Sequence, residues 1–160
     1  MTDCLKHNES VDEKIITISK GKYMSASIIA LMGYISWTLI LLLALISYRT
    51  YLSMSGNFAG LQFKADGTDV PDFGNRLTRA QANCIECFCF IGGVLLLAIA
   101  TDSMAITNGL AFTLLGARLA QSLVHLASTS NFAIQLRFAL FLIQLGIVVY
   151  WLIKLFAKFF

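Results

Sequence analysis

Four long apolar runs, separated by short polar stretches, dominate the pattern of the sequence. They cover about residues 25–48, 77–100, 104–127 and 132–157. Each is close to or above the roughly 20 residues that an α-helix needs to cross a bilayer. Only helices or closed β-barrels satisfy the backbone in lipid, and no run alternates polar and apolar residues with a period of two. The pattern therefore predicts an all-α protein with four transmembrane helices.

The stretches between the runs have the composition of turns. The longest, residues 49–76, contains "GTDVPDFGN", which is rich in Gly, Asp and Pro. "TDS" at residues 101–103 predicts a tight turn, and "STSN" at residues 128–131 predicts a turn that caps the fourth helix. Connections this short predict an integral membrane four-helix up-down bundle. The start of the second and fourth spans and the end of the first and third then lie at one membrane surface.

Composition supports a multi-pass membrane protein and excludes other classes. Of 160 residues, 58% are hydrophobic and only 13% are charged, whereas a soluble domain is about a quarter charged. Residues 1–22 form a polar arm without the pattern of a signal peptide, and residues 23–160 form one membrane domain. The net charge of +3 is dispersed, with no basic and aromatic cluster for nucleic acid. Lysine and arginine are too evenly divided between the two surfaces to orient the chain.

The cysteines do not form the pattern of a metal site. Cys84, Cys87 and Cys89 lie on one predicted helix, and Cys84 and Cys87 have the CxxC spacing. A structural zinc site needs a second pair or a histidine cluster, and neither is present. The sequence therefore predicts small buried side chains and no bound metal.

The polar residues inside the spans fall on single helix faces. In the second span they are spaced i, i+4, i+7, and in the third i, i+3, i+7, so that each set covers about 60° of arc. A seventh residue lies near the start of the fourth span. The seven are Arg79, Asn83 and Glu86, then Arg118, Gln121 and His125, and finally Arg137.

Because the spans alternate in direction, these seven side chains are expected to converge near one surface. Ionisable groups inside a membrane face the bundle interior and mark functional sites by default. A purely structural alternative pairs Glu86 with Arg118 or Arg79 as a lock between helices. In it, Asn83 or Gln121 forms hydrogen bonds between helices, and Arg79 and Arg137 extend to the lipid headgroups. A site is favoured, because three arginines against one glutamate leave positive charge without compensation. Such a site suits the carboxylates or phosphates that arginine binds with two parallel hydrogen bonds.

The same residues carry a resemblance to a known family. "RLTRAQANCIECF" at residues 76–88 resembles the second-helix signature of the MAPEG family, the membrane-associated proteins of eicosanoid and glutathione metabolism. "GARLAQSLVHLASTSN" and "NFAIQLRFALF" resemble the family's third and fourth helices. The resemblance implies a homotrimer that binds glutathione between neighbouring subunits.

The resemblance also implies roles for individual residues. Arg79, Asn83 and Glu86 would hold the polar groups of glutathione, and Arg118 would support the same pocket. By the resemblance, Arg137 would be the catalytic residue that faces the sulfur. Gln121 and His125 are expected to line the pocket from their spacing with Arg118 on the third span. Glutathione has two carboxylates for arginines and an ammonium group for Glu86, and a cation beside its thiol favours the nucleophilic thiolate.

The function implied is that of a glutathione-dependent membrane transferase or peroxidase. Glutathione would be the co-substrate, and a lipophilic electrophile would enter from the bilayer. Three features depart from the catalytic members: Cys87 follows the glutamate, His125 replaces a tyrosine, and the turn before Arg137 is longer. They are closer to an uncharacterised bacterial branch, for which the location would be the cell inner membrane. The alternative is a non-catalytic membrane protein of the same fold that binds an anionic ligand or a partner, so enzymatic activity stays open.

Overall fold

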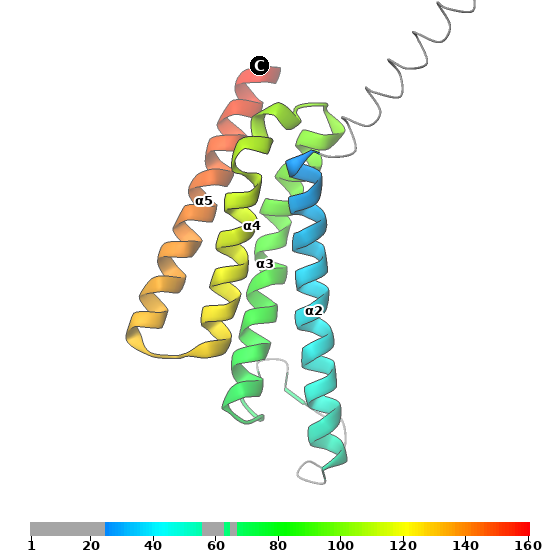
Figure 1. Cartoon of the computed structure of the whole chain (residues 1–160), viewed down its shortest axis with the longest axis vertical. Helices are drawn as coiled ribbons and strands as arrows, with labels where there is room; N and C mark the ends of the chain where they lie inside the picture. Colours follow the sequence, from blue (N-terminus) through cyan, green and yellow to red (C-terminus); the bar gives the residue numbers. More distant parts are fainter. Residues whose placement is uncertain (1–24, 56–62, 65–66) are drawn as a thin grey trace, which may run out of the picture.

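The computed structural model describes residues 25–55, 63–64 and 67–160, and its secondary structure consists of four α-helices. These are α2 (Ala26–Met54), α3 (Asp72–Ala100), α4 (Met104–Ala127) and α5 (Asn131–Phe159). They run up and down along a common direction, joined by short connections (Figure 1). The predicted all-α four-helix up-down bundle is confirmed. The predicted polar arm, residues 1–22, lies outside the described residues.

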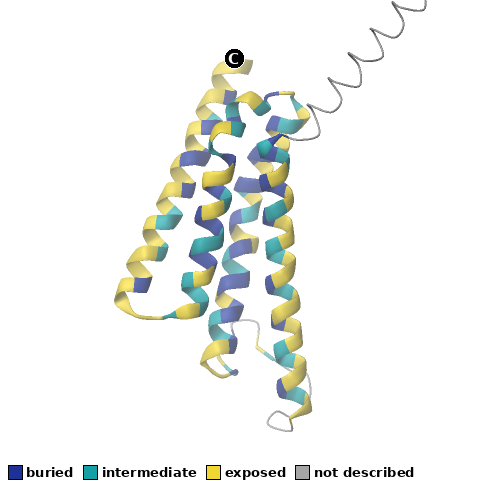
Figure 2. Cartoon of the chain, viewed as in Figure 1, coloured by how far each residue is buried: buried dark blue, intermediate teal, exposed yellow. Residues whose placement is uncertain are grey.

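All four helices are long and apolar enough to cross a membrane. They contain 24 to 29 residues, which corresponds to about 36–44 Å at about 1.5 Å per residue. The hydrocarbon core of a bilayer is about 30 Å thick, so the helix ends reach into the headgroup regions. Large apolar side chains cover the outside of the bundle, among them Met32, Leu43 and Ile153. Figure 2 shows these exposed outer faces along every helix, with the buried residues turned inward.

The two shorter turns have the predicted chemistry. Between α3 and α4, Asp102 takes a positive φ of 49°, a conformation in which Asp and Asn are enriched among residues other than glycine. At the start of α5, the Ser130 side chain accepts a hydrogen bond from the Ala133 backbone N–H over 3.3 Å. The predicted cap of the fourth helix is therefore confirmed.

The first connection is shorter than the sequence predicted. α2 continues through Arg49 to Met54, and α3 begins at Asp72 instead of Leu77. Asp72 follows Pro71 and places a carboxylate in the first turn of α3, where the helix dipole stabilises negative charge. Arg49 still reaches across the connection, because its Nη2 donates to the Lys64 carbonyl (3.2 Å). The earlier start of α3 places its first arginines within regular helix, which fixes the direction of their side chains.

The helices pack so that α2, α3 and α4 contact one another and α5 packs mainly along α4. The core towards the C-terminal end of the bundle is mainly apolar, with Ile91, Leu95, Leu114 and Trp151 at most 1% exposed, but it also contains a buried hydrogen bond between the Ser27 and Thr107 hydroxyls (2.6 Å). Figure 1 shows the start of α3, the end of α4 and the start of α5 at the opposite end of the bundle. This is the end at which the topology predicts the polar residues to meet.

Candidate functional site

A fully buried arginine lies at the centre of the polar end of the bundle. Arg118 in α4 is 0% exposed. Its Nε donates to the Tyr34 hydroxyl (2.8 Å), and its Nη1 donates to Gln121 Oε1 (2.7 Å). Its Nη1 and Nη2 donate to the side-chain and backbone oxygens of Asn83 (2.9 and 2.6 Å). Every one of these acceptors is neutral, so the guanidinium is held by hydrogen bonds and not by an ion pair.

The network around Arg118 joins all four helices. The Tyr34 hydroxyl of α2 donates a hydrogen bond to the Cys84 carbonyl of α3 (2.9 Å). Gln144 of α5 donates to Gln121 Oε1 of α4 (2.9 Å). We call Tyr34, Asn83, Arg118, Gln121 and Gln144 the arginine hub. Because buried polar groups are costly unless paired, the hub fixes the rotation of each helix about its axis.

A cavity of about 400 Å³ opens beside the hub, between the first turns of α3, the end of α4 and the start of α5. Its volume lies in the range of small-molecule sites. We call it the arginine cavity, because three of its lining residues are arginines and only one is acidic. Its lining consists of Asp72, Asn75, Arg76, Arg79, His125, Thr129, Ile134 and Arg137.

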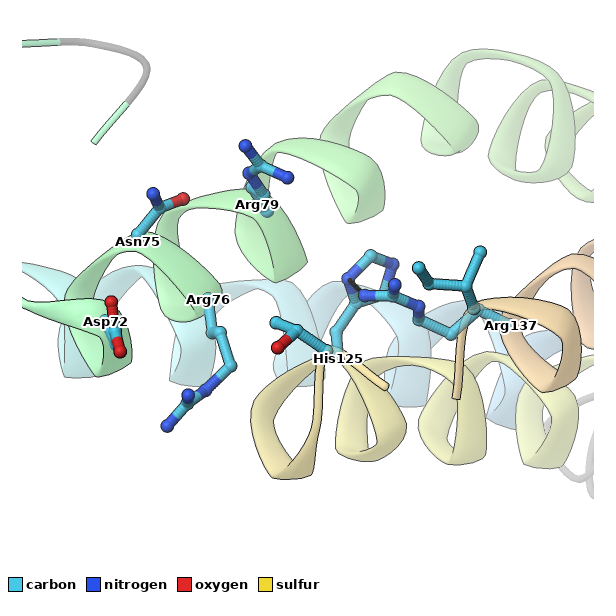
Figure 3. A pocket seen from close by; sticks show the side chains of 8 residues that line it. Asp72, Asn75, Arg76, Arg79, His125 and Arg137 are labelled. Atoms are coloured by element: carbon cyan, nitrogen blue, oxygen red, sulfur yellow. Dashed lines mark hydrogen bonds between the residues drawn. The ribbon is translucent and has the colours of Figure 1, made fainter. Parts of the chain in front are cut away.

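The three arginines of the cavity are held to different degrees. Arg76 Nε donates to the Leu126 carbonyl (3.0 Å), and Arg137 Nη1 bonds His125 Nδ1 (2.9 Å). Arg79 is exposed and makes no hydrogen bond or ion pair to any described residue. Figure 3 shows Arg79 on α3 across the cavity from Arg137, with the His125 ring beside Arg137. Among the described residues, the cavity therefore contains one guanidinium without a partner and two that are oriented by α4.

Glu86 belongs neither to the hub nor to the cavity. Its side chain is exposed on α3, about 10 Å further along the helix than Arg79 at about 1.5 Å per residue. Within the described part of the chain it makes no hydrogen bond or ion pair. The structural alternative, a lock between Glu86 and Arg118 or Arg79, is therefore wrong for the single subunit. Arg118 instead satisfies its donors with neutral oxygens.

The structure thus divides the seven residues that the sequence grouped together. Asn83, Arg118 and Gln121 lie in the hub, while Arg79, His125 and Arg137 line the cavity. One contact joins the two groups, because Gln121 Nε2 donates to the Arg137 carbonyl (3.3 Å). Arg118 is too deeply buried to meet a ligand, so it can affect the cavity only through the residues that it holds.

Sequence reasoning missed two residues of the hub, Tyr34 and Gln144, and five that line the cavity, two of which are Thr129 and Ile134. Tyr34 and Gln144 are polar groups inside apolar runs, which is itself a signal. Gln144 also follows Arg137 by seven residues, a spacing that places both on one face of a helix. Asp72, Asn75 and Arg76 were assigned to a loop. With α3 starting at Asp72, they share a helix face with Arg79 at spacings of three, four and seven residues.

The cysteines of α3 play no evident part in the cavity. Cys84 and Cys87 are buried, and Cys84 Sγ lies 3.3 Å from Ser122 Oγ. Cys89 is exposed on the outer face. Among the described residues, no three His, Cys, Asp or Glu side chains are placed to hold a metal ion. That the protein binds no metal stays a prediction.

Together these features define a four-span membrane protein with an arginine-lined cavity at one end and a buried arginine beside it. The sequence profile of the MAPEG family matches residues 27–157, which is most of the chain. The chain therefore belongs to the MAPEG family of multi-pass membrane proteins, which is associated with glutathione and eicosanoid metabolism. No curated protein matches it individually. No solved structure matches it either.

Proposed function

We propose that the protein binds glutathione in the arginine cavity and uses it as co-substrate in a transferase or peroxidase reaction on a lipophilic electrophile. The observation that carries this proposal is the charge of the cavity, where three guanidiniums face one carboxylate. Glutathione brings two carboxylates, one ammonium group and one thiol. Arginine pairs with carboxylates through two parallel hydrogen bonds, so the ligand and the cavity are complementary in charge and geometry.

The free and the oriented arginines suit different ends of the ligand. Arg79 has no partner in the described chain and is available for a carboxylate. Arg137 is oriented by His125 and is assigned to the sulfur. Glu86 lies about 10 Å from the level of Arg79 along α3, and an extended tripeptide is about that long at about 3.5 Å per residue. The ammonium group of glutathione is therefore assigned to Glu86.

Conjugation needs only a thiolate and an electrophile, whereas reduction of a peroxide to an alcohol and water consumes two glutathione molecules, which leave as the disulfide. A cation at the sulfur favours loss of the thiol proton, and the thiolate then attacks the electrophilic atom of the second substrate. In a conjugation, a bond forms from sulfur to carbon and the leaving group departs with the bonding electrons. A lipophilic substrate reaches the protein from the bilayer. An apolar groove of about 240 Å³ between α2 and α3, lined by Ile35, Leu39 and Phe88, offers it a surface.

A glutathione titration tests the proposal directly. We expect purified protein in detergent to bind glutathione and to show thiolate absorbance near neutral pH. Arg79→Ala should weaken binding by about tenfold or more, the loss of about 1.4 kcal/mol or more. Lys154→Ala, an exposed cation near the other end of the bundle, is the matched control and should bind normally. Absence of binding to wild-type protein would sink the proposal, whereas binding without thiolate would favour the non-catalytic alternative.

The exposed position of Glu86 predicts that a second copy of the chain covers it. A charged side chain within a span costs about 3 kcal/mol when it faces lipid, and Glu86 has no partner in its own subunit among the described residues. We propose a homotrimer, which is consistent with the family. Native mass spectrometry in mild detergent should show three chains, and monomer alone would count decisively against this.

Two substitutions at Glu86 test whether the ligand site requires its negative charge. We expect Glu86→Gln to weaken glutathione binding more than Glu86→Asp, because only the glutamine removes the negative charge that an ammonium group requires. Equilibrium binding on both variants measures this. Equal affinity of Glu86→Gln and wild type, with normal assembly, would remove Glu86 from the site.

A further inference from the structure

The contact between Arg137 and His125 fixes the state of the imidazole ring. Arg137 Nη1 lies 2.9 Å from His125 Nδ1. A guanidinium has only donors, so Nδ1 must be the acceptor. The ring proton of a neutral histidine then sits on Nε2. His125 in this contact is neutral and presents Nε2–H as its remaining polar group.

A second contact from the same helix holds the backbone of Arg137. Gln121 Nε2 donates to the Arg137 carbonyl (3.3 Å). Gln121 and His125 are four residues apart on α4, so their side chains lie on one helix face, one turn apart. We call these two contacts the Arg137 clamp. One residue of the clamp fixes where Arg137 sits, and the other fixes where its side chain points.

The positive charges around His125 explain why Arg137 needs His125 Nδ1 as an acceptor. Arg79 and Arg76 of α3, Arg137 of α5 and Arg118 of α4 are cations near this end of the bundle, and Asp72 of α3 is the only acid lining the cavity. A guanidinium among other cations is repelled unless an acceptor fixes it. A protonated imidazole has no acceptor atom and would release Arg137.

We propose that His125 is a positioning residue, whose neutral imidazole accepts from Arg137 through Nδ1 and so aims the guanidinium at the sulfur of a bound thiol. His125 is then not a general base, because its one acceptor lone pair is engaged by Arg137. The part of this inference that concerns the thiol rests on the proposed function. The clamp itself does not, since the contact exists without a ligand.

Nitrogen NMR of ligand-free protein tests the clamp independently of glutathione. The sequence contains one other histidine, His7, so a His7→Gln background leaves a single labelled ring. At pH 7.5 we expect the signals of a neutral ring with its proton on Nε2 and an unprotonated, hydrogen-bonded Nδ1. Arg137→Ala should shift the Nδ1 signal towards that of a free acceptor. A ring protonated on Nδ1, or an Nδ1 signal unaffected by Arg137→Ala, would overturn the clamp.

Two substitutions at His125 test its effect on the thiol. Asparagine places an amide oxygen near the position of Nδ1, whereas phenylalanine keeps a ring of similar size without an acceptor. We expect His125→Asn to keep the thiolate fraction of bound glutathione within about threefold of wild type and His125→Phe to lower it by about tenfold or more. The glutathione Kd of each variant is measured alongside, so that the thiolate fraction is compared at equal occupancy of the site.

The pattern of results separates the two proposals. A wild-type thiolate fraction in His125→Phe, or an equal loss in both variants, would overturn the positioning role. A merely structural role would lower thermal stability without separating asparagine from phenylalanine in the thiolate signal. If wild-type protein binds no glutathione, the proposed function fails, and the NMR measurement still decides whether the clamp exists.

Discussion

Replacing Arg137 with alanine is expected to abolish thiolate formation and conjugation while glutathione binding stays within about tenfold of wild type, about 1.4 kcal/mol. Arg137 and Arg79 line the cavity from α5 and α3, and Arg79, which has no partner in the described part of the chain, is assigned to a carboxylate. The cation on α5 is assigned to the thiol. Without it, the charged form of the sulfur loses its stabilisation, whereas the rest of the ligand keeps its contacts. Difference absorbance and a conjugation assay with a lipophilic electrophile measure the two effects separately.

Arg137→Lys serves as the matched variant. Charge matters more than the planar shape of a guanidinium at a sulfur atom, so lysine should recover part of the thiolate signal. Loss of binding in parallel with loss of thiolate would show instead that Arg137 holds a carboxylate. Wild-type protein that binds glutathione well but forms no thiolate between pH 7 and 8 would exclude the enzyme. The longer turn at residues 128–131, which precedes Arg137, would then be the first feature to examine.

Replacing Arg118 with alanine is expected to destabilise the folded subunit by about 3 kcal/mol. The substitution leaves the side-chain oxygen of Asn83 without its donor and takes one donor each from Tyr34 and Gln121. An unsatisfied buried polar group costs about 1–3 kcal/mol, although hydrogen bonds between membrane helices average about 0.6 kcal/mol. Arg118→Lys should recover only part of the loss, because an ammonium group lacks the planar array of five donors.

Thermal unfolding in detergent, followed by circular dichroism, measures this effect. Arg79→Ala is the matched control, because Arg79 is exposed and unpaired in the described chain, and we expect a change below about 0.5 kcal/mol. An Arg118→Ala protein as stable as Arg79→Ala would show that the hub contributes no net stability. A normal thiolate signal in a destabilised but folded Arg118→Ala protein would show that the hub does not support Arg137.

The amino-acid pattern alone was enough to predict the four membrane helices, their up-down order and the end at which the polar residues meet. Each of these depends on local properties. The length and hydropathy of a run decide whether it spans a bilayer, and Asp102 and Ser130 have the chemistry that their turns require. Once the spans alternate in direction, the polar ends of α3, α4 and α5 are placed together by connectivity alone.

The sequence did not show which polar residues touch, because residue spacing gives only the relative directions of side chains on one helix. Helical spacing placed Asn83 and Glu86 on nearly the same face of α3, yet Asn83 is bonded to Arg118 and Glu86 faces outward. A rotation of a few tens of degrees about the axis of α3 decides between these outcomes. That rotation is set by packing against α2 and α4, which no single segment specifies.

The packing of the helices also determined which residues bind Arg118. Spacing suggested Glu86 as its counter-charge, but the folded subunit surrounds it with neutral oxygens, including the hydroxyl of Tyr34 from a span without charged residues. Likewise, α3 starts at Asp72, so Asp72, Asn75 and Arg76, which were expected in a loop, are helical and line the cavity. The hydropathy of each segment determined which segments cross the membrane. The packing of all four helices determined which side chains lie in the hub, which line the cavity and which, like Glu86, are exposed on the outside of the subunit.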